Sequence, residues 1–304
     1  MSGCDSSSAN RRVRPATLAW AGKDVRRSRT VWVRLRRDRV ALGGLGLFSL
    51  LLGVAVLAPL ISPYDPNAQD LRSNLQASSR AHLLGTDDLG RDLLSRIIYG
   101  SRVSLVAGLA AMAVALCLGV FIGATTGYFH GLYEAVMMRA MDSLLAFPGI
   151  ILAIALMAAL RPSLQNVIIA LGVVATPAYA RLVRGSVLSV KERDYVEAAR
   201  AIGAGHGRIL AHYIMPNVMA PIIVQATLQT GSAMLAEAGL SFLGLGVQPP
   251  TASWGSILND GRPYLYAAPY AAIFPGLAIM VAVLSLNLLG DGLRDALDPR
   301  LSEG

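Results

Sequence analysis

Six long stretches of this 304-residue chain carry no charged side chain, and they constrain its fold more than any other feature. They run over residues 40–64, 103–133, 143–160, 162–180, 209–236 and 263–290. Each is close to or above the roughly 20 residues that an α-helix needs to cross a bilayer. A helix also satisfies its own backbone hydrogen bonds, which lipid cannot do. The sequence therefore predicts an all-α membrane protein with six transmembrane helices.

The fourth stretch is the weakest of the six, because Gln165, Asn166 and Pro177 dilute its apolar character. The number of spans matters, since the loss of one would move every later loop to the opposite side of the membrane. Proline lacks a backbone N–H and interrupts the helical hydrogen bonds. We therefore expect kinks in the third, fourth and sixth spans, at Pro148, Pro177 and Pro275.

Positive charge is concentrated before the first span. Residues 1–39 hold eleven Lys and Arg side chains and three Asp side chains, which accounts for the whole net charge of +8. Basic residues that flank membrane spans mark the cytoplasmic side. Six crossings from a cytoplasmic N-terminus leave twenty Lys and Arg side chains inside and seven outside. The pattern predicts cytoplasmic N- and C-termini in a bacterial inner membrane, and it favours membrane lipid over a nucleic-acid partner.

This topology assigns a side to every loop. The segments 128–139, 181–217 and 291–304 are predicted to face the cytoplasm, and the loops 63–102, 161–163 and 241–262 to face outward.

The longest predicted outer loop contains a further helical pattern. Its apolar side chains recur at helical spacing, on Leu89, Leu93, Leu94, Ile97 and Ile98. The charged Arg91, Asp92 and Arg96 fall on the opposite face. Asp87 or Asp88 can cap such a helix. We expect a short amphipathic helix at the outer surface, either lying on the membrane or packed against the bundle.

A charged, alanine-rich stretch interrupts the apolar pattern between the fourth and fifth spans. Ser189 and Glu192 have the spacing of a capping box, so we expect a helix to begin there and to run to about Ile202. Gly203 or Gly205 can end it, because glycine adopts a left-handed turn without a steric penalty. A helix this short is not stable alone and must pack on something. It is either an ordinary connection packed on its own bundle or a contact for another protein, which its small residues Ala198, Ala199 and Ala201 would let approach closely.

Two groups of ionisable residues have the spacing of ion pairs. In the predicted cytoplasmic helix, Glu197 can pair with Arg193 or Arg200. Where the third span enters the membrane, Arg139 and Asp142 lie three residues apart. A pair at the membrane interface is the simpler interpretation of the second group, and a place in a substrate path is the alternative.

Glu237 lies near the outer end of the fifth span. An ionisable group at such a depth faces the interior of the bundle or a water-filled cavity. Pairing with Arg262 or Arg102 is one interpretation, and binding of a transported molecule is the other. Glu237, Asp142 and Arg139 are therefore the candidate residues of a translocation path or gate.

Residues for catalysis are missing from the sequence. ATP hydrolysis by a P-loop protein requires the motif GxxxxGK[ST]. The chain has two lysines, Lys23 and Lys191, and neither follows such a glycine pattern. The sequence also lacks a G-x-S-x-G motif, an H-E-x-x-H motif and paired cysteines. We predict a chain without catalytic residues or a metal site, so that energy for transport must come from another subunit.

A family resemblance begins in the alanine-rich stretch. The EAA motif of ABC-importer permease subunits is similar to Glu197, Ala198 and Ala199, followed by Gly203, Ile214 and Pro216. Four further blocks resemble the C-type permeases of dipeptide and oligopeptide importers: HLLGTDDLGRDLLSRIIYGSRVSL (82–105), RAMDSLLAFPGIILAIAL (139–156), EAGLSFLGLGVQPPTASWGSIL (237–258) and LGDGLRDALDPRL (289–301). The resemblance covers the chain from about residue 39 to residue 301.

The resemblance implies a type I ABC-importer (MetI-like) permease fold and a pore-forming role. It implies a heterodimer with a B-type permease, two cytoplasmic ATPase subunits and an extracytoplasmic substrate-binding protein. ATP and Mg²⁺ would be held by the ATPase subunits, and this chain would bind no cofactor of its own.

In this family, the loop that carries the EAA motif forms a coupling helix against the ATPase. The implied coupling loop is 189–216, within the cytoplasmic segment 181–217. The residues assigned to coupling are Arg193, Glu197, Ala198, Ala199, Arg200, Gly203, Ile214 and Pro216. The expected divisions of the chain are a basic tail (1–39), the first span with the external segment (40–101), the transmembrane domain (102–291) and a C-terminal tail (292–304).

The resemblance favours di- or oligopeptides as cargo, with nickel complexes or glutathione as alternatives. A secondary transporter, or a membrane anchor without an ATPase, is the alternative from another class. A secondary transporter would carry internal repeats and ionisable residues near the membrane centre, which the sequence lacks. An anchor would have no use for the 189–216 loop.

Overall fold

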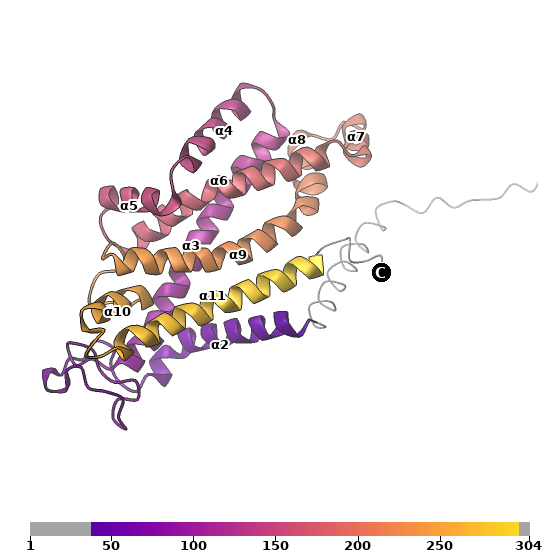
Figure 1. Ribbon diagram of the computed structural model, residues 1–304. Coiled ribbons are helices and arrows are strands. Elements are labelled where there is room, and N and C mark those ends of the chain that lie inside the picture. Colours follow the sequence, from indigo (N-terminus) through magenta and orange to yellow (C-terminus); the bar gives the residue numbers. More distant parts are fainter. Residues whose placement is uncertain (1–37, 298–304) are drawn as a thin grey trace, which may run out of the picture.

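The computed structural model describes residues 38–297. Over that range the chain forms helices and no β-strand (Figure 1). The α-helices are α2 (Arg39–Ile61), α3 (Leu93–Tyr128), α4 (Leu132–Leu145), α5 (Gly149–Leu160), α6 (Leu164–Lys191), α7 (Asp194–Ala201), α8 (His206–Arg208), α9 (Met215–Phe242), α10 (Trp254–Gly261) and α11 (Tyr270–Leu297). Three shorter turns are η1 (Leu71–Ser73), the π-helical η2 (Ile209–Ile214) and η3 (Arg262–Tyr264). The predicted all-α class is confirmed, and the predicted basic tail (1–39) lies almost wholly outside the described residues.

Five helical segments are long and apolar enough to cross a membrane: α2, α3, α6, the run from α8 to α9, and α11. Helices α4 and α5 form a sixth apolar segment, but they are bent by 95° relative to each other. The break falls at Pro148, which precedes α5 and cannot donate a helical hydrogen bond. Six apolar segments are therefore present as predicted. The broken segment is the third and not the fourth. The fourth, α6, is a single helix of 28 residues that includes Pro177.

The order of the helices across the bundle differs from their order in the chain. In Figure 1, α4 with α5, then α6, α9, α11 and α2 follow one another, and each contacts the next. Helix α3 crosses this row obliquely and contacts α2, α6 and α9. Helix α7 and both described chain ends lie at one end of the bundle, the α7 end. Helix α10 and the loop between α2 and α3 lie at the other, the α10 end. The side of the membrane that each end faces stays a prediction.

Glycines bring α3 and α6 into close contact. Gly119, Gly123 and Gly127 repeat every fourth residue along α3 and face α6. A Cβ atom added to Gly123 would lie 2.4 Å from the carbonyl oxygen of Ala180. Helices in lipid associate through such small-residue contacts, because hydrocarbon provides no hydrophobic force between them. We call these three glycines and the α6 backbone opposite them the α3–α6 seam.

Helix α3 begins differently from the prediction. Asp92 is its N-cap, and the Asp92 carboxylate accepts hydrogen bonds from the Ser95 backbone N–H at 2.8 Å and from the Ser95 hydroxyl at 2.6 Å. The helix then continues without a break for 36 residues. The separate amphipathic helix with a cap at Asp87 or Asp88 is therefore wrong. Its apolar pattern belongs to the first turns of the second span.

We predict that Gly123→Leu destabilises the bundle, because its side chain cannot fit between α3 and the backbone of α6. Overpacking of this kind costs about 3 kcal/mol. The melting temperature of the detergent-purified protein measures the loss. Gly53→Leu is the control, since a Cβ added at Gly53 meets no atom within 4 Å. Equal melting temperatures for the two variants would contradict the close packing of the seam.

Candidate functional site

The helix predicted in the alanine-rich stretch is α7, and it begins later than expected. Helix α6 continues through Ser189 to Lys191, so the predicted capping box at Ser189 is wrong. Arg193 is the N-cap residue of α7 instead. The apolar face of α6 extends to Val190, which is buried. Packing of this last turn keeps α6 helical beyond the local signal for a helix start.

Helix α7 ends where the sequence predicts. Gly203 has a φ of +79°, in the left-handed region. Its N–H donates to the carbonyl of Arg200 at 2.9 Å, and the Ala204 N–H donates to the carbonyl of Ala199 at 3.1 Å. This is the hydrogen-bond pattern of a glycine-terminated helix. Of the two candidate glycines, Gly203 makes the turn, whereas Gly205 has an ordinary φ of −66° before α8.

One edge of α7 is packed firmly on the bundle. Val196 and Ala199 are 0 % and 2 % exposed. They belong to an apolar cluster that contains Tyr128 of α3, Val183, Val187 and Val190 of α6, Ile209 and Ile214 of η2, and Val218 and Ile222 of α9. Ile214 is therefore a core residue, while Pro216 is exposed at the start of α9. Helix α7 contacts η2 and α6, and the cluster connects it through them to α3 and α9 (Figure 1).

A polar network supports the same junction. The Tyr128 hydroxyl and His206 Nδ1 are 2.8 Å apart. The Lys191 ammonium donates to the Tyr128 carbonyl oxygen at 2.8 Å and lies 2.8 Å from His130 Nε2. These contacts tie the ends of α3 and α6 to the start of α8. Sequence reasoning missed them, because the partners are 78, 63 and 61 residues apart and no local pattern pairs them.

The opposite side of α7 is exposed. It carries Arg193, Glu197, Ala198 and Arg200, together with Ile202, which is 79 % exposed. We call these five residues the α7 face. Within the described part of the chain Glu197 has no ion pair, so the predicted pairing with Arg193 or Arg200 is wrong. The α7 face thus presents three charged side chains and one large apolar side chain on the side away from the buried edge of the helix.

Charged side chains also converge at the α10 end. The Arg91 Nε donates to Asp87 at 2.6 Å, and Arg96 and Arg91 both donate to Asp260 of α10, at 3.1 Å and 3.3 Å. The side chains of Arg91 and Arg96 are only 6 % and 2 % exposed. Their predicted place on an exposed polar face is therefore wrong. Burial raises the pKa of Asp260, and the positive charges of Arg96 and Arg91 oppose that rise.

Glu237 is fully buried in α9. Its carboxylate accepts a hydrogen bond from the Ser241 hydroxyl at 2.7 Å. The guanidinium of Arg262 instead lies over the ring of Phe242, 5.6 Å from its centroid. The predicted ion pair with Arg262 or Arg102 is therefore wrong, and a hydroxyl on the next turn of the helix takes its place.

Asp142 pairs with a residue of another helix. Arg181 of α6 donates to its carboxylate at 2.7 Å. The predicted pair with Arg139 on the same helix is wrong, because α4 lies beside α6 and brings Arg181 within reach. Both side chains of the observed pair are more than half exposed. A path or gate role for Glu237, Asp142 and Arg139 stays a prediction.

Comparison of the sequence with known protein families identifies the family of this chain. The model for the binding-protein-dependent transport system inner membrane component matches residues 115–303, which include α7 and its supports. The chain belongs to this family. A second model, for the N-terminal TM domain of oligopeptide transport permease C, matches residues 27–77. The permease is thus a non-catalytic transmembrane subunit of an ABC importer, located in the inner membrane.

Curated relatives resemble the permease over nearly its whole length. It is 44 % identical to the dipeptide transport system permease protein DppC of Alkalihalophilus pseudofirmus, over 90 % of each chain. It is 46 % identical to the di/tripeptide transport system permease protein DppC of Pseudomonas aeruginosa, over 89 % of this chain and 91 % of the relative. The glutathione transport system permease protein GsiD of Pectobacterium atrosepticum is also 46 % identical, over 90 % of this chain and 91 % of the relative.

Solved structures share the fold of the permease. A chain of the inward-facing MetNI methionine ABC transporter superposes with a TM-score of 0.56 and 19 % sequence identity. The match covers 68 % of this chain and 98 % of that one. An amino acid ABC transporter gives a TM-score of 0.53 and 16 % identity, over 66 % of this chain and 94 % of the other. The predicted MetI-like fold is confirmed.

We predict that Asp260→Asn destabilises the permease, because it leaves two buried arginines with fewer carboxylates. Removing one partner of a buried ion pair costs up to about 5 kcal/mol, and we expect about 2 kcal/mol for this partly exposed position. The melting temperature of the purified protein measures the effect.

Asp88→Asn is the matched control, because Asp88 is as exposed as Asp260 and is 3.9 Å from Arg91 at its closest. A loss as large for Asp88→Asn would show that Asp260 has no special role in the cluster.

Proposed function

We propose that the permease forms half of the membrane path of an importer for di- or oligopeptides. Its partners would be a B-type permease, two cytoplasmic ATPase subunits and an extracytoplasmic substrate-binding protein. The relatives named for dipeptide and di/tripeptide transport support the cargo. The relative named for glutathione transport makes glutathione, itself a tripeptide, the second candidate.

The exposure of the α7 face is the main support for the proposal that this chain couples to an ATPase. It presents Glu197, Arg200 and the exposed Ile202 away from the bundle. Its other edge, at Val196 and Ala199, is buried in the cluster that joins α3, α6 and α9. An ATPase bound to the exposed side would therefore move the transmembrane helices and not only a loop. ATP and Mg²⁺ would stay on the ATPase, because this chain has no P-loop.

The orientation follows from the same proposal. The α7 end would face the cytoplasm, where the ATPase subunits are, and both chain ends would lie on that side. The α10 end would face the substrate-binding protein. The ion pairs of Asp260 with Arg91 and Arg96 hold α10 to the start of α3 there. These ion pairs would hold the surface to which the substrate-binding protein binds in one conformation.

Glu197→Arg tests the coupling role. We expect the tagged wild-type permease to co-purify with an ATPase subunit from gently solubilised membranes. The charge-reversed variant should lose the ATPase, or lose its stimulation of ATP hydrolysis by at least tenfold, as expected when a charged contact worth more than about 1.4 kcal/mol becomes repulsive. Western blotting of the same membranes confirms that both forms accumulate equally.

Asp295→Arg is the matched control. Asp295 is an exposed carboxylate of α11, at the α7 end but outside the α7 face. This variant should keep the ATPase. An unchanged complex with Glu197→Arg would contradict the coupling role. A wild-type permease that brings down no ATPase would contradict the importer assembly itself.

A further inference from the structure

Two cavities follow one another along the facing sides of α6 and α9. The first, of about 270 Å³, is lined by residues 171–178 of α6 and 229–236 of α9, with α3 and α5 as further walls. The second, of about 520 Å³, is lined by residues 181–190 of α6 and 217–221 of α9. The two helices run antiparallel, so the linings continue in register from one cavity to the next. We call the two cavities together the α6–α9 groove, and the second lies nearer the α7 end.

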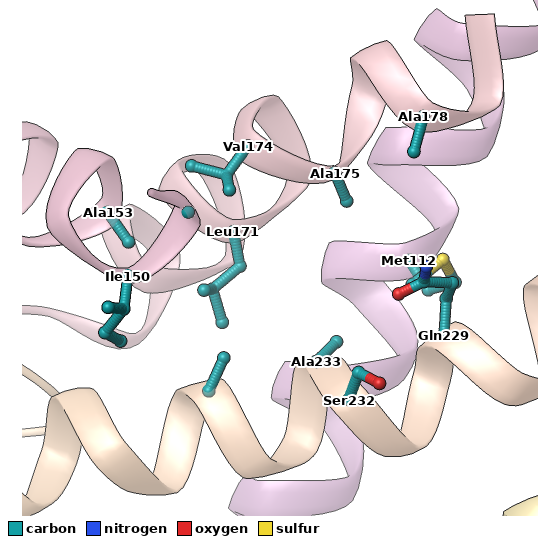
Figure 2. A pocket seen from close by; sticks show the side chains of 12 residues that line it. Met112, Ile150, Ala153, Leu171, Val174, Ala175, Ala178, Gln229, Ser232 and Ala233 are labelled. Carbon is teal, nitrogen blue, oxygen red and sulfur yellow. The ribbon is translucent and has the colours of Figure 1, made fainter. Parts of the chain in front are cut away.

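Most of the first cavity is lined by small or apolar side chains, such as Gly149, Ala153, Ala175 and Ala178. Gln229 and Ser232 of α9 are the polar exceptions among the described residues. In Figure 2, Gln229 projects from α9 toward α6, and Ser232 lies on the next turn of α9. Neither side chain has a hydrogen-bond partner among the described residues.

Gln229 and Ser232 are part of a longer stripe. Gln225, Gln229 and Ser232 are separated by four and three residues, so these polar side chains lie on one side of α9. The span that contains them carries the polar stripe near its middle. A carboxamide that faces lipid leaves its N–H and C=O groups unsatisfied, which costs free energy. Polar side chains in a span therefore face a protein partner or a water-filled path.

We infer that the α6–α9 groove receives the main chain of the transported peptide, and that Gln229 and Ser232 form hydrogen bonds with its amide groups. A carboxamide both donates and accepts, as does a hydroxyl, so the pair matches the C=O and N–H groups common to every peptide. The small residues opposite leave room for side chains of different size. This inference rests on the proposed function, and it adds where and how the permease binds its cargo.

The second cavity gives the groove an exit. Its lining includes Arg181, Ser186, Ser189 and Asn217 beside apolar residues, so it is more polar than the lining of the first cavity. This gradient suits a peptide that passes from a membrane-embedded groove to water. Ser189 thus lines the groove and does not cap a helix. Two other occupants are outcomes of the test: a helix of the partner permease, and lipid chains.

Transport kinetics test the hydrogen bonds. The complete importer is reconstituted in liposomes, and uptake of radiolabelled dialanine is measured against concentration. We expect Gln229→Leu to lower the maximal uptake rate about tenfold, the equivalent of one hydrogen bond of about 1.4 kcal/mol, with KM little changed because the substrate-binding protein captures dialanine first. Thr227→Val is the control, because Thr227 lies on the opposite side of α9 and bonds to its own helix at Ile223. An unchanged maximal rate for Gln229→Leu would overturn the inference.

Labelling of cysteines tests the groove even if Gln229→Leu fails to assemble. Cys4 and Cys117 are first replaced by serine, and Ser232→Cys or Ile223→Cys is added. A membrane-impermeant thiol reagent should label Ser232→Cys, and dialanine should slow that labelling. Ile223→Cys, on the far side of α9, should stay unlabelled.

The labelling of Ser232→Cys distinguishes a groove that binds cargo from one that is filled by a partner helix or lipid. Labelling of Ser232→Cys that dialanine does not slow, or no labelling at all, overturns the inference, because a partner helix or lipid then fills the groove. Dialanine uptake by the wild-type importer separates this failure from failure of the proposed function. If the wild-type importer takes up dialanine, the peptide cargo stands. If it does not, the proposed cargo fails.

Discussion

The close approach of α3 and α6 is the contact on which the rest of the structure depends. Three glycines spaced four residues apart let the two backbones meet where a single methyl group would collide. Lipid offers no hydrophobic drive for helix association, so this packing must come from shape. The seam sets the position of α6, and α6 in turn supplies both a support of α7 and one wall of the groove.

The supports of α7 and the walls of the groove are therefore the same helices. Val183, Val187 and Val190 of α6 pack in the cluster that holds α7, and the residues between them line the second cavity. Helix α9 has the same double role, with Val218 lying in both. Close-packed interiors transmit a displacement and do not absorb it. A displacement of α7 by a bound ATPase would thus also shift the walls of the α6–α9 groove.

The sequence predicted those features that depend on local patterns. The apolar blocks located the spans, and Gly203 ended α7, since a positive φ favours glycine whatever surrounds it. The failures share a cause: a partner distant in sequence overruled the local pattern. Helical spacing placed Arg91 and Arg96 on the polar face of an amphipathic helix, but both are buried and pair with Asp260, more than 160 residues away. Ser189 had the pattern of a cap, yet packing of Val190 carried α6 past it.

Site-specific photo-cross-linking in intact membranes tests the central claim most directly. A benzoylphenylalanine is placed at Ile202, at the α7 face, or at Tyr266, which is fully exposed at the α10 end. We expect the probe at Ile202 to cross-link to an ATPase subunit and the probe at Tyr266 not to do so. Cross-linking of the ATPase from Tyr266, or from neither position, would contradict the assignment of α7 as the helix that couples ATP hydrolysis to transport.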